Sequence, residues 1–423
     1  MTLTPFTRRY GLALLAIVYM FNFVDRQILA ILLPAIKAEF GVTDATLGFL
    51  VGTAFALFYV TLGVPIARLA DRWNRRNLIA LALALWSGMT AISGLAQNVV
   101  HLTLARIGVG IGEAGCSPPA HSIISDYYPP EHRSTAMGVY TLGISAGIML
   151  AYLAGGWVVQ NIGWREALFI VGIPGLVLAL IVRFTLVEPE RGASEARVDS
   201  GRQASLGEVI AFVAKRRSFL HMGVAAGLSS FVGYAVINFM PTFMYRSHGM
   251  DFQQTGFWLG IILGIAGGFG FFAGGYIADR VGRQGQQRAF VFLMFAMLVS
   301  VAFYAAVFLV QSAAWCLAMF VLPAAISNFY LAPVLAQAQS LVSLRMRAVA
   351  SSLILLLINI IGLALGPPTA GALSDALAGS YGNESMRYSL LIVGTVMLPW
   401  AAFHYWRAGA TIEADLARAA EHD

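Results

Sequence analysis

The feature that most constrains this chain is a succession of twelve apolar stretches, most of them long enough to cross a membrane. A helix needs about 20 apolar residues to span about 30 Å of hydrocarbon. Leucine, alanine and glycine dominate these stretches, which exceed the roughly ten residues of a barrel strand. Because backbone amides in hydrocarbon must be hydrogen-bonded within their own segment, we expect helices. The expected spans are roughly Tyr10–Ile36, Ala45–Leu69, Leu78–Leu95, Val99–Tyr127, Thr135–Val159, Ala167–Val187, Phe219–Tyr245, Thr255–Ala278, Ala289–Val310, Ala314–Leu341, Ala348–Leu373 and Tyr388–Tyr405.

The composition excludes several classes of protein. Hydrophobic residues make up 58% of the 423 positions and charged residues only 11%, whereas a soluble domain carries about 25% charged residues. An ordinary cytosolic enzyme and a disordered chain are therefore excluded. The net charge of +6 does not indicate nucleic-acid binding, because the basic residues follow the membrane topology. The chain is predicted to be an all-α polytopic membrane protein.

The basic residues predict the orientation of the spans. Outside the spans, the side that holds both termini carries nearly all of them, and the opposite side holds only Lys37, Arg165, Arg246 and Arg387. Cytoplasmic loops are enriched in lysine and arginine. Both termini are therefore predicted to be cytoplasmic, in a plasma or inner membrane. The first apolar run is too long, and carries an internal charge, for a cleaved signal peptide. Cys116 and Cys316 fall within spans, so no disulfide framework is expected.

The chain is predicted to be a duplication of a six-helix unit. The polar segment 188–217 separates an N-terminal bundle, residues 1–187, from a C-terminal bundle with a short tail, residues 218–423. An Asp-Arg pair follows span two, at Asp71 and Arg72, and recurs after span eight, at Asp279 and Arg280. In duplicated transporters of this kind, the substrate site forms between the two halves near the midplane of the membrane.

These motifs carry a resemblance to a known family. The repeated Asp-Arg motif, together with Arg106-x-x-x-Gly110-x-Gly112 in span four, resembles the signatures of the major facilitator superfamily. The runs 22–27 (NFVDRQ), 105–115 (ARIGVGIGEAG) and 163–165 (GWR) resemble the spinster-type subfamily. The resemblance implies twelve helices in two pseudo-symmetric bundles, a secondary active transporter and no enzymatic activity. Span five lacks the proline of the antiporter motif, so the direction of transport is not carried over.

Four charges lie inside predicted spans, away from their ends: Asp25, Arg26, Arg106 and Glu113. A charge at a helix centre costs about 2.5–3.5 kcal/mol on insertion scales. Arg106 and Glu113 are seven residues apart and share one helix face, and Gly108, Gly112 and Gly115 form a separate stripe suited to close packing. We interpret Asp25 and Glu113 as proton-binding groups, with Arg26 and Arg106 as counter-ions or contacts for an anionic headgroup. The spinster resemblance implies the same for Asp25, Arg26 and Glu113. The alternative is a set of static ion pairs.

Two further sets of residues are candidates. The loop motifs are expected to form a cytoplasmic gate whose arginines pair with acids across the halves, or alternatively to act only as topology anchors: Asp71, Arg72, Arg75, Asp279, Arg280 and Arg283. Polar residues in spans are candidates for the lining of a substrate cavity, or alternatively for ordinary helix contacts: Asn22, Tyr59, Tyr140, Ser230, Tyr234, Asn238, Asn328 and Asn359.

The sequence predicts a proton-coupled transporter that works by alternating access, powered by a proton gradient without a cofactor. No Walker A loop or HExxH motif occurs. A charged half facing a neutral, aromatic half suits an amphipathic substrate, and the resemblance implies a lysophospholipid or sphingoid phosphate. One alternative is a transporter of small organic or aromatic anions or drugs; another is a non-transporting receptor or lipid-binding scaffold. The expected partners are membrane lipids and the substrate, with no nucleic acid and no metal, and the chain is expected to be a monomer. The sequence leaves open import against export, symport against antiport, and the proton stoichiometry.

Overall fold

The computed structural model describes residues 4–191, 206–343 and 346–420. In these ranges the regular structure is helical throughout, with α-helices and short π- and 3₁₀-helical segments. Eleven segments are long and apolar enough to cross a membrane, and the last, Val349–Ala419, has 71 residues. It contains two spans, because α17 ends at Tyr381 and the chain turns at Gly382, where φ is 53°. The chain is therefore an all-α membrane protein with twelve spans, as predicted.

The chain forms two compact units. Unit 1 comprises Met1–Val42, Phe49–Asp199 and Met250–Gly264, and unit 2 comprises Thr43–Gly48, Ser200–Gly249 and Ile265–Asp423. Each unit therefore includes a short stretch, 43–48 or 250–264, from the sequence half that mainly builds the other. Both stretches lie at or near the start of the second span of a half, a detail that the sequence did not indicate.

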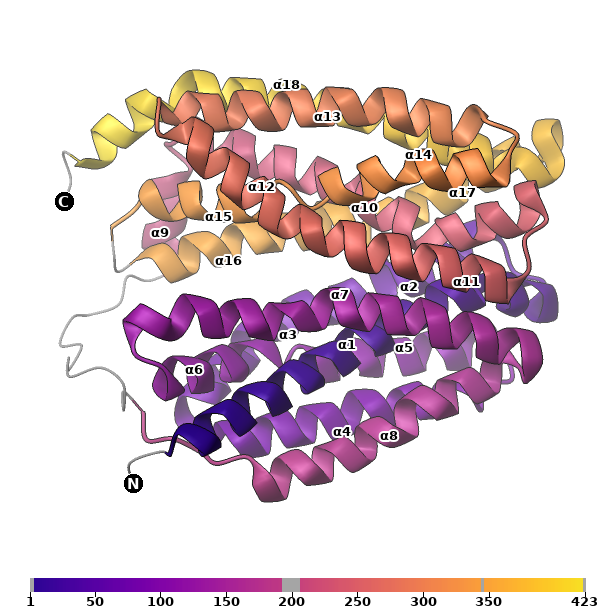
Figure 1. The fold of residues 1–423 in the computed structure, drawn as a ribbon, viewed down its shortest axis with the longest axis horizontal. Helices are drawn as coiled ribbons and strands as arrows, with labels where there is room; N and C mark the ends of the chain where they lie inside the picture. Colours follow the sequence, from indigo (N-terminus) through magenta and orange to yellow (C-terminus); the bar gives the residue numbers. More distant parts are fainter. Residues whose placement is uncertain (1–3, 192–205, 344–345, 421–423) are drawn as a thin grey trace. The chain divides into compact units, whose positions relative to one another are not determined.

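Unit 1 is built on a few extensive helix pairs (Figure 1). Helix α1 packs along α7, α4 packs along both α8 and α5, and α11 packs along α7. Its helices are α1 (Pro5–Phe40), the end of α2 (Asp44–Val51), α3 (Thr53–Arg72), α4 (Arg75–Ser93), α5 (Val99–Glu113), α6 (Ser117–Tyr127), α7 (Pro130–Asn161), α8 (Trp164–Thr185) and α11 (Phe252–Ile261).

Unit 2 is centred on α18, which packs along α10 and α13. Its elements are α9 (Leu206–Val213), α10 (Arg217–His248), α12 (Gly267–Gly282), α13 (Gln286–Leu309), α14 (Ala313–Ile326), α15 (Leu331–Ser340), α16 (Arg347–Leu357), η3 (Ile358–Ala364), α17 (Gly366–Tyr381), η4 (Gly382–Glu384) and α18 (Ser385–Ala420). The π-helix η1 (Ile262–Ala266) lies where the chain passes from unit 1 into unit 2.

The predicted linker, 188–217, contains structure of its own. Residues 192–205, which include the basic residues Arg197 and Arg202, lie outside the described residues. The remainder includes helix α9, whose Val209 and Val213 are buried in unit 2. Apolar residues four apart share a helix face, which explains how a short helix inside a polar segment finds a packing surface.

Glycines in α5 allow the close packing that positions the charged residues. A Cβ on Gly112 would lie 2.7 Å from the backbone nitrogen of Trp86, and a Cβ on Gly108 would lie 2.7 Å from the side chain of Met89, both on α4. Gly115 lies just after the end of α5, and a Cβ there would lie 2.8 Å from the Cβ of Ala82 on α4. The predicted packing stripe is thus confirmed, and it holds α5 directly against α4.

Candidate functional site

The charged centre of unit 1 is an ion pair between α1 and α5. The guanidinium of Arg26 donates to Oε2 of Glu113 twice, from Nη2 at 2.6 Å and from Nε at 3.0 Å. Oδ1 of Asn22, one turn earlier on α1, lies 3.4 Å from Nη2. Glu113 is 1% exposed and Arg26 is 8% exposed. Both members of this pair are therefore buried, the carboxylate more completely than the arginine.

Aromatic rings surround the guanidinium of Arg26. Its central carbon lies 4.9 Å from the ring centroids of Phe23 and Phe55 and 5.0 Å from that of Tyr59. A cation within about 6 Å of an aromatic face is attracted by the negative face of the ring. The rings of Phe55 and Tyr59 stack with 5.4 Å between centroids. These rings therefore stabilise the Arg26 cation in addition to its ion pair with Glu113.

Asp25 occupies a separate environment, although it is adjacent to Arg26 in the sequence. It is fully buried, and its Oδ2 accepts a hydrogen bond of 3.1 Å from the indole Nε1 of Trp86 on α4. No arginine of the described residues forms an ion pair with its carboxylate. The two carboxylates are therefore held differently, Glu113 by a cation and Asp25 by a neutral donor.

Arg106 contacts α1 through the backbone. Its Nη1 donates to the carbonyl oxygen of Asp25 at 3.1 Å, and its guanidinium carbon lies 5.4 Å from the ring centroid of Phe55. Its Nε and Nη2 make no hydrogen bond within the described residues. The expectation that Arg106 and Glu113 share a face agrees with this geometry, because both side chains reach α1. Within the part of the chain that the structure describes, Arg106 forms no ion pair with a carboxylate.

Sequence reasoning missed the residues that complete this centre. Trp86 and Phe55 supply the indole donor and the central ring, and neither carries a charge that marks it in the sequence. A buried tryptophan needs a partner for its N–H, so an indole in an apolar span was a usable signal for Trp86. The closeness of Phe55 follows from Gly110, where a Cβ would lie 2.6 Å from the carbonyl oxygen of Phe55.

Among the predicted gate residues, Arg75 makes the most contacts, and all of them lie within unit 1. Its Nε donates to Glu188 at 2.8 Å, its Nη1 to Asp126 and Ser122, and its Nη2 to the carbonyl of Pro189. Arg75 is 1% exposed. It was expected to pair with acids of the other half, whereas here it fastens the end of the segment after α8 to α4 and α6.

The other gate residues make fewer contacts. Arg72, Asp279 and Arg283 are exposed, and Arg280 is exposed with its Nη1 3.4 Å from the hydroxyl of Tyr276. Helix α3 includes the backbone of Asp71, whose side chain lies outside what the structure describes. The gating role of these residues stays a prediction.

A second buried ionic cluster, within unit 2, was not singled out from the sequence. Both carboxylate oxygens of Asp44 accept hydrogen bonds of 2.7 Å from Arg246, and Ser374 also donates to Asp44 at 2.7 Å. The carboxylate of Asp375 accepts from the backbone nitrogens of Asp44 and Ala45 at 2.9 and 2.7 Å. This Asp44 cluster holds residues 43–48 against α10 and α17.

The predicted cavity residues fall into different environments. In unit 1, Asn22 and Tyr59 belong to the surroundings of Arg26, whereas Tyr140 is fully buried and stacks on Tyr19 with 4.3 Å between centroids. In unit 2 the side-chain amides of Asn238 and Asn359 donate to backbone carbonyls one turn earlier, those of Tyr234 and Leu355. The amide of Asn328 donates to the carbonyl of Gly267. Ser230 is buried, with 4% exposed, and packs against Gly362. Of the three predicted cavity residues that belong to unit 1, Asn22 and Tyr59 thus lie at its charged centre.

Comparison with known proteins gives consistent matches over most of the chain. Residues 15–367 match the family model described as Major Facilitator Superfamily. A crystal structure of a bacterial homolog to the human lysosomal transporter Spinster, inward-facing and unoccupied, aligns with a TM-score of 0.88 and 31% identity, covering 97% of this chain and 99% of that one. An MFS-type efflux pump of Mycolicibacterium smegmatis is 32% identical over 96% of this chain and 94% of its own length. The cis,cis-muconate transport protein of Acinetobacter baylyi is 26% identical over 62% of this chain and 63% of its own length.

Proposed function

Because this chain belongs to the Major Facilitator Superfamily and is a transporter of the spinster type, we propose that it moves an amphipathic organic anion together with a proton by alternating access. The observation that carries the proposal is the Arg26–Glu113 pair: a fully buried carboxylate bound to an arginine that is 8% exposed and lies among aromatic rings. An arginine of this kind is a binding group for an anionic substrate, and the carboxylate is a proton acceptor.

The coupling follows from competition for one guanidinium. A carboxylate or phosphate group of the substrate binds Arg26 by the bidentate geometry that such anions favour. Glu113 then loses its ionised partner in a buried site, where an isolated charge is costly. It becomes neutral by binding a proton. The net charge of the site is therefore the same in both states. In the empty site Arg26 is balanced by ionised Glu113, and in the occupied site it is balanced by the substrate anion while Glu113 is neutral.

Asp25 and Arg106 form the second part of the proposal. Oδ1 of Asp25 and the Nε and Nη2 atoms of Arg106 make no hydrogen bond within the described residues. Arg106 of α5 already reaches α1 at the backbone carbonyl of Asp25, whose carboxylate is bound to Trp86 of α4. A change in the contact between these helices lets the Asp25 carboxylate exchange Trp86 for Arg106, which changes its proton affinity during the cycle.

For the substrate we propose a lipid-like anion such as a lysophospholipid or a sphingoid phosphate. Phe23, Phe55 and Tyr59 around Arg26 form an apolar surface directly next to the cation, which suits a charged group attached to an apolar body. A small dicarboxylate is the second candidate, favoured by the similarity to a muconate transport protein. Such a molecule also offers an anion to Arg26 but lacks a long apolar tail.

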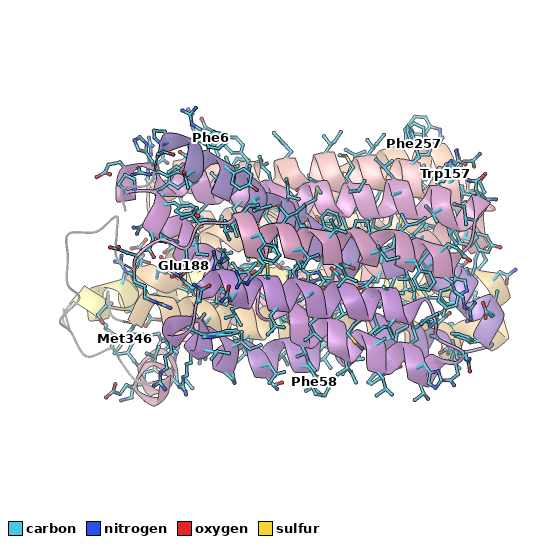
Figure 2. All side chains as sticks on the ribbon, turned by 90° about the horizontal axis from the view of Figure 1, so that it is seen from below. Phe6, Phe58, Trp157, Glu188, Phe257 and Met346 are labelled. Carbon is cyan, nitrogen blue, oxygen red and sulfur yellow. The ribbon has the colours of Figure 1, made fainter. Side chains whose placement is uncertain are left out.

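For the topology we propose that both termini are cytoplasmic, in a plasma or inner membrane. Figure 2 shows Phe6 and Glu188 toward one end of unit 1, and Trp157 and Phe257 toward the opposite end. The first end also carries the basic run of residues 72–76, whose Arg72 is exposed and whose Arg76 is half-buried. The positive-inside rule assigns that end to the cytoplasm.

The experiment is uptake into proteoliposomes that contain the purified full chain under an imposed pH gradient. Lysophospholipids, sphingoid phosphates, aromatic dicarboxylates and cationic drugs are compared. We expect a lipid-like anion to accumulate in wild type, and Glu113→Gln to abolish accumulation while retaining substrate binding. Glu131→Gln, at an exposed position in the first turn of α7, is the matched control. Gradient-independent uptake by wild type, or undiminished accumulation by Glu113→Gln, contradicts the proposal.

A further inference from the structure

A groove lies between α7 and the start of α11, within unit 1 and away from the Arg26 site. Its volume is about 410 Å³, and it is lined by Leu153 and Trp157 of α7 and by Asp251, Gln253, Gln254, Phe257 and Trp258 at the start of α11. It lies at the end of unit 1 where Figure 2 places Trp157 and Phe257. Tryptophan is enriched in membrane proteins at the boundary between hydrocarbon and headgroups, so the two exposed tryptophans indicate that this end of the helices lies at that boundary.

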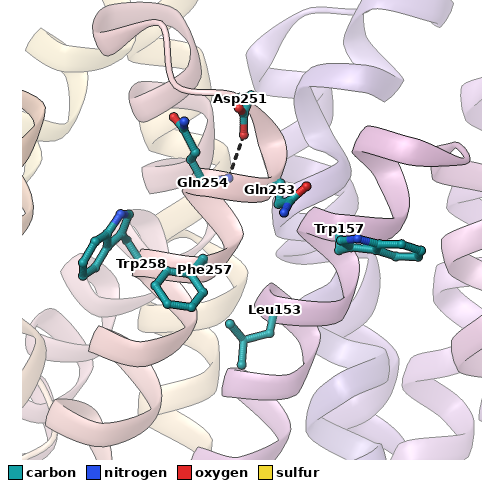
Figure 3. Close-up of a pocket in the computed structure, with 7 residues that line it drawn as sticks. All are labelled: Leu153, Trp157, Asp251, Gln253, Gln254, Phe257 and Trp258. Carbon is teal, nitrogen blue, oxygen red and sulfur yellow. Dashed lines mark hydrogen bonds between the residues drawn. The ribbon is translucent and has the colours of Figure 1, made fainter.

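The groove is polar at one end and apolar at the other. In Figure 3, Asp251, Gln253 and Gln254 lie at the terminus of α11, and Phe257 and Leu153 lie about one turn deeper, with Trp157 and Trp258 on either side. The three aromatic residues are about half exposed. A headgroup at the polar end and an acyl chain over Leu153 and Phe257 would follow the same direction as a lipid in the bilayer.

The charge of the groove selects the headgroup. Asp251 supplies a carboxylate. Among the described residues, the lining of the groove includes no lysine or arginine. Oδ1 of Asp251 accepts from the backbone nitrogen of Gln254 at 2.7 Å as the N-cap of α11. The carboxylate keeps its second oxygen for a ligand, and the amide oxygens of Gln253 and Gln254 are further acceptors. Tryptophan faces bind cations, so the lining favours an ammonium group over an anionic headgroup.

The two helices that line the groove make a tight contact at residues adjacent to its lining. A Cβ on Gly256 would lie 2.3 Å from the carbonyl oxygen of Tyr152, and a Cβ on Gly156 would lie 2.5 Å from that of Phe252. The amide oxygen of Gln160 accepts from the backbone nitrogen of Phe252 at 3.1 Å. A ligand in the groove therefore touches both helices at the place where residues 250–264 are held against α7.

We propose that this groove binds a phospholipid with a primary ammonium headgroup, phosphatidylethanolamine, and that the bound lipid strengthens the contact of α11 with α7. The ammonium has three N–H donors for the oxygens of Asp251, Gln253 and Gln254, and the acyl chain covers Leu153 and the exposed rings. The lipid is a structural ligand of the groove, independent of the transported substrate and of the role of Arg26 and Glu113.

Native mass spectrometry of the purified full chain with equimolar phosphatidylethanolamine and phosphatidylglycerol of identical acyl chains tests the proposal. We expect wild type to retain phosphatidylethanolamine preferentially, and Asp251→Asn to reduce this preference by about two- to fivefold, the range for a partly exposed ion pair. Asparagine keeps the N-cap, as Asn74 and Asn98 show by capping α4 and α5 in this chain. Replacing Trp157 and Trp258 together by leucine lowers retention of both lipids.

Hydrogen exchange over residues 252–261 in nanodiscs provides a second measurement. Phosphatidylethanolamine is expected to slow exchange in wild type relative to phosphatidylglycerol, and to have no such effect in Asp251→Asn. Equal retention of the two lipids by wild type, or an unchanged preference in Asp251→Asn, overturns the proposal. A lipid-free dimer that the double tryptophan replacement dissociates also overturns it, because a second copy of the chain would then be the occupant.

Discussion

The Arg26–Glu113 pair is expected to contribute little to the stability of the fold, although both of its members are buried. Replacing Glu113 by leucine removes the acceptor of both Arg26 hydrogen bonds and leaves a cation in hydrocarbon. Breaking a buried pair at one partner costs about 3–5 kcal/mol, whereas replacing both partners by apolar residues is often neutral or stabilising. We therefore predict that Glu113→Leu is strongly destabilising and that the double variant Arg26→Met, Glu113→Leu recovers nearly all of the loss.

The structure supports methionine as the partner replacement. Phe23, Phe55 and Tyr59 lie around the guanidinium, and a methionine sulfur packs favourably against aromatic rings. At about 2–4 °C of melting temperature per kcal/mol for a unit of 150–250 residues, Glu113→Leu lowers the melting temperature of unit 1 by roughly 6–20 °C. The double variant melts within about 4 °C of wild type, yet it accumulates no substrate.

The two cysteines allow the thermal unfolding of unit 1 to be measured separately from that of unit 2. Cys116, in unit 1, and Cys316, in unit 2, are both free and buried. In a Cys316→Ser background, a dye that becomes fluorescent on reacting with a thiol reports the exposure of Cys116 during heating. A double variant as unstable as Glu113→Leu alone refutes the reasoning, because the loss would then arise from packing and not from an unpaired charge.

Two further predictions concern positions outside the pair. Gly110→Val is expected to abolish recovery of monodisperse protein in size-exclusion chromatography, because even the Cβ of the valine would lie 2.6 Å from the carbonyl oxygen of Phe55. Gly63→Ala is the control, since nothing lies within 4 Å of the added Cβ. Equal recovery of the two variants contradicts the expectation. Asp44→Asn removes the charge that binds Arg246. This variant is expected to speed hydrogen exchange over residues 43–48 at least tenfold, which corresponds to about 1.4 kcal/mol. Unchanged exchange there would show that Asp375 alone holds the segment.

The sequence predicted the spans and the family well because both depend on local patterns. Apolar length and the spacing of Asp71 and Asp279 are read directly from the chain. Helix ends were less predictable: α1 begins at Pro5, after the Thr4 cap, and ends at Phe40, before Gly41. It therefore begins five residues before the predicted span and ends four residues after it. Apolar scales do not register these polar end turns, whereas the caps determine where the helix stops.

The partners of the charged residues could not be predicted in the same way. The sequence identified Asp25, Arg26, Arg106 and Glu113 because charge in hydrocarbon is rare. It did not indicate that Glu113 pairs with Arg26 while Asp25 accepts from Trp86, because pairing depends on how α1, α4 and α5 are rotated against each other. That rotation is fixed by contacts such as Gly112 against Trp86.

The partners of Arg75 and Asp44 could not be predicted for the same reason. Arg75 was assigned partners in the other half from its position in a repeated motif, and the structure gives it Asp126 and Glu188 of its own unit. Asp44 and Arg246 lie near predicted span ends, where charges are ordinary, and only the fold shows that Asp44 is 1% exposed.

The most direct test of the coupling is to count the protons that Glu113 takes up when the substrate binds. The purified protein is placed in weakly buffered detergent with a pH-sensitive dye, and the anion identified in the uptake screen is added at saturation. If the anion displaces Glu113 from Arg26, wild type removes up to about one proton per chain from solution and Glu113→Gln removes none. Proton release by wild type, or the same uptake in both proteins, would contradict the competition between substrate and Glu113 for Arg26.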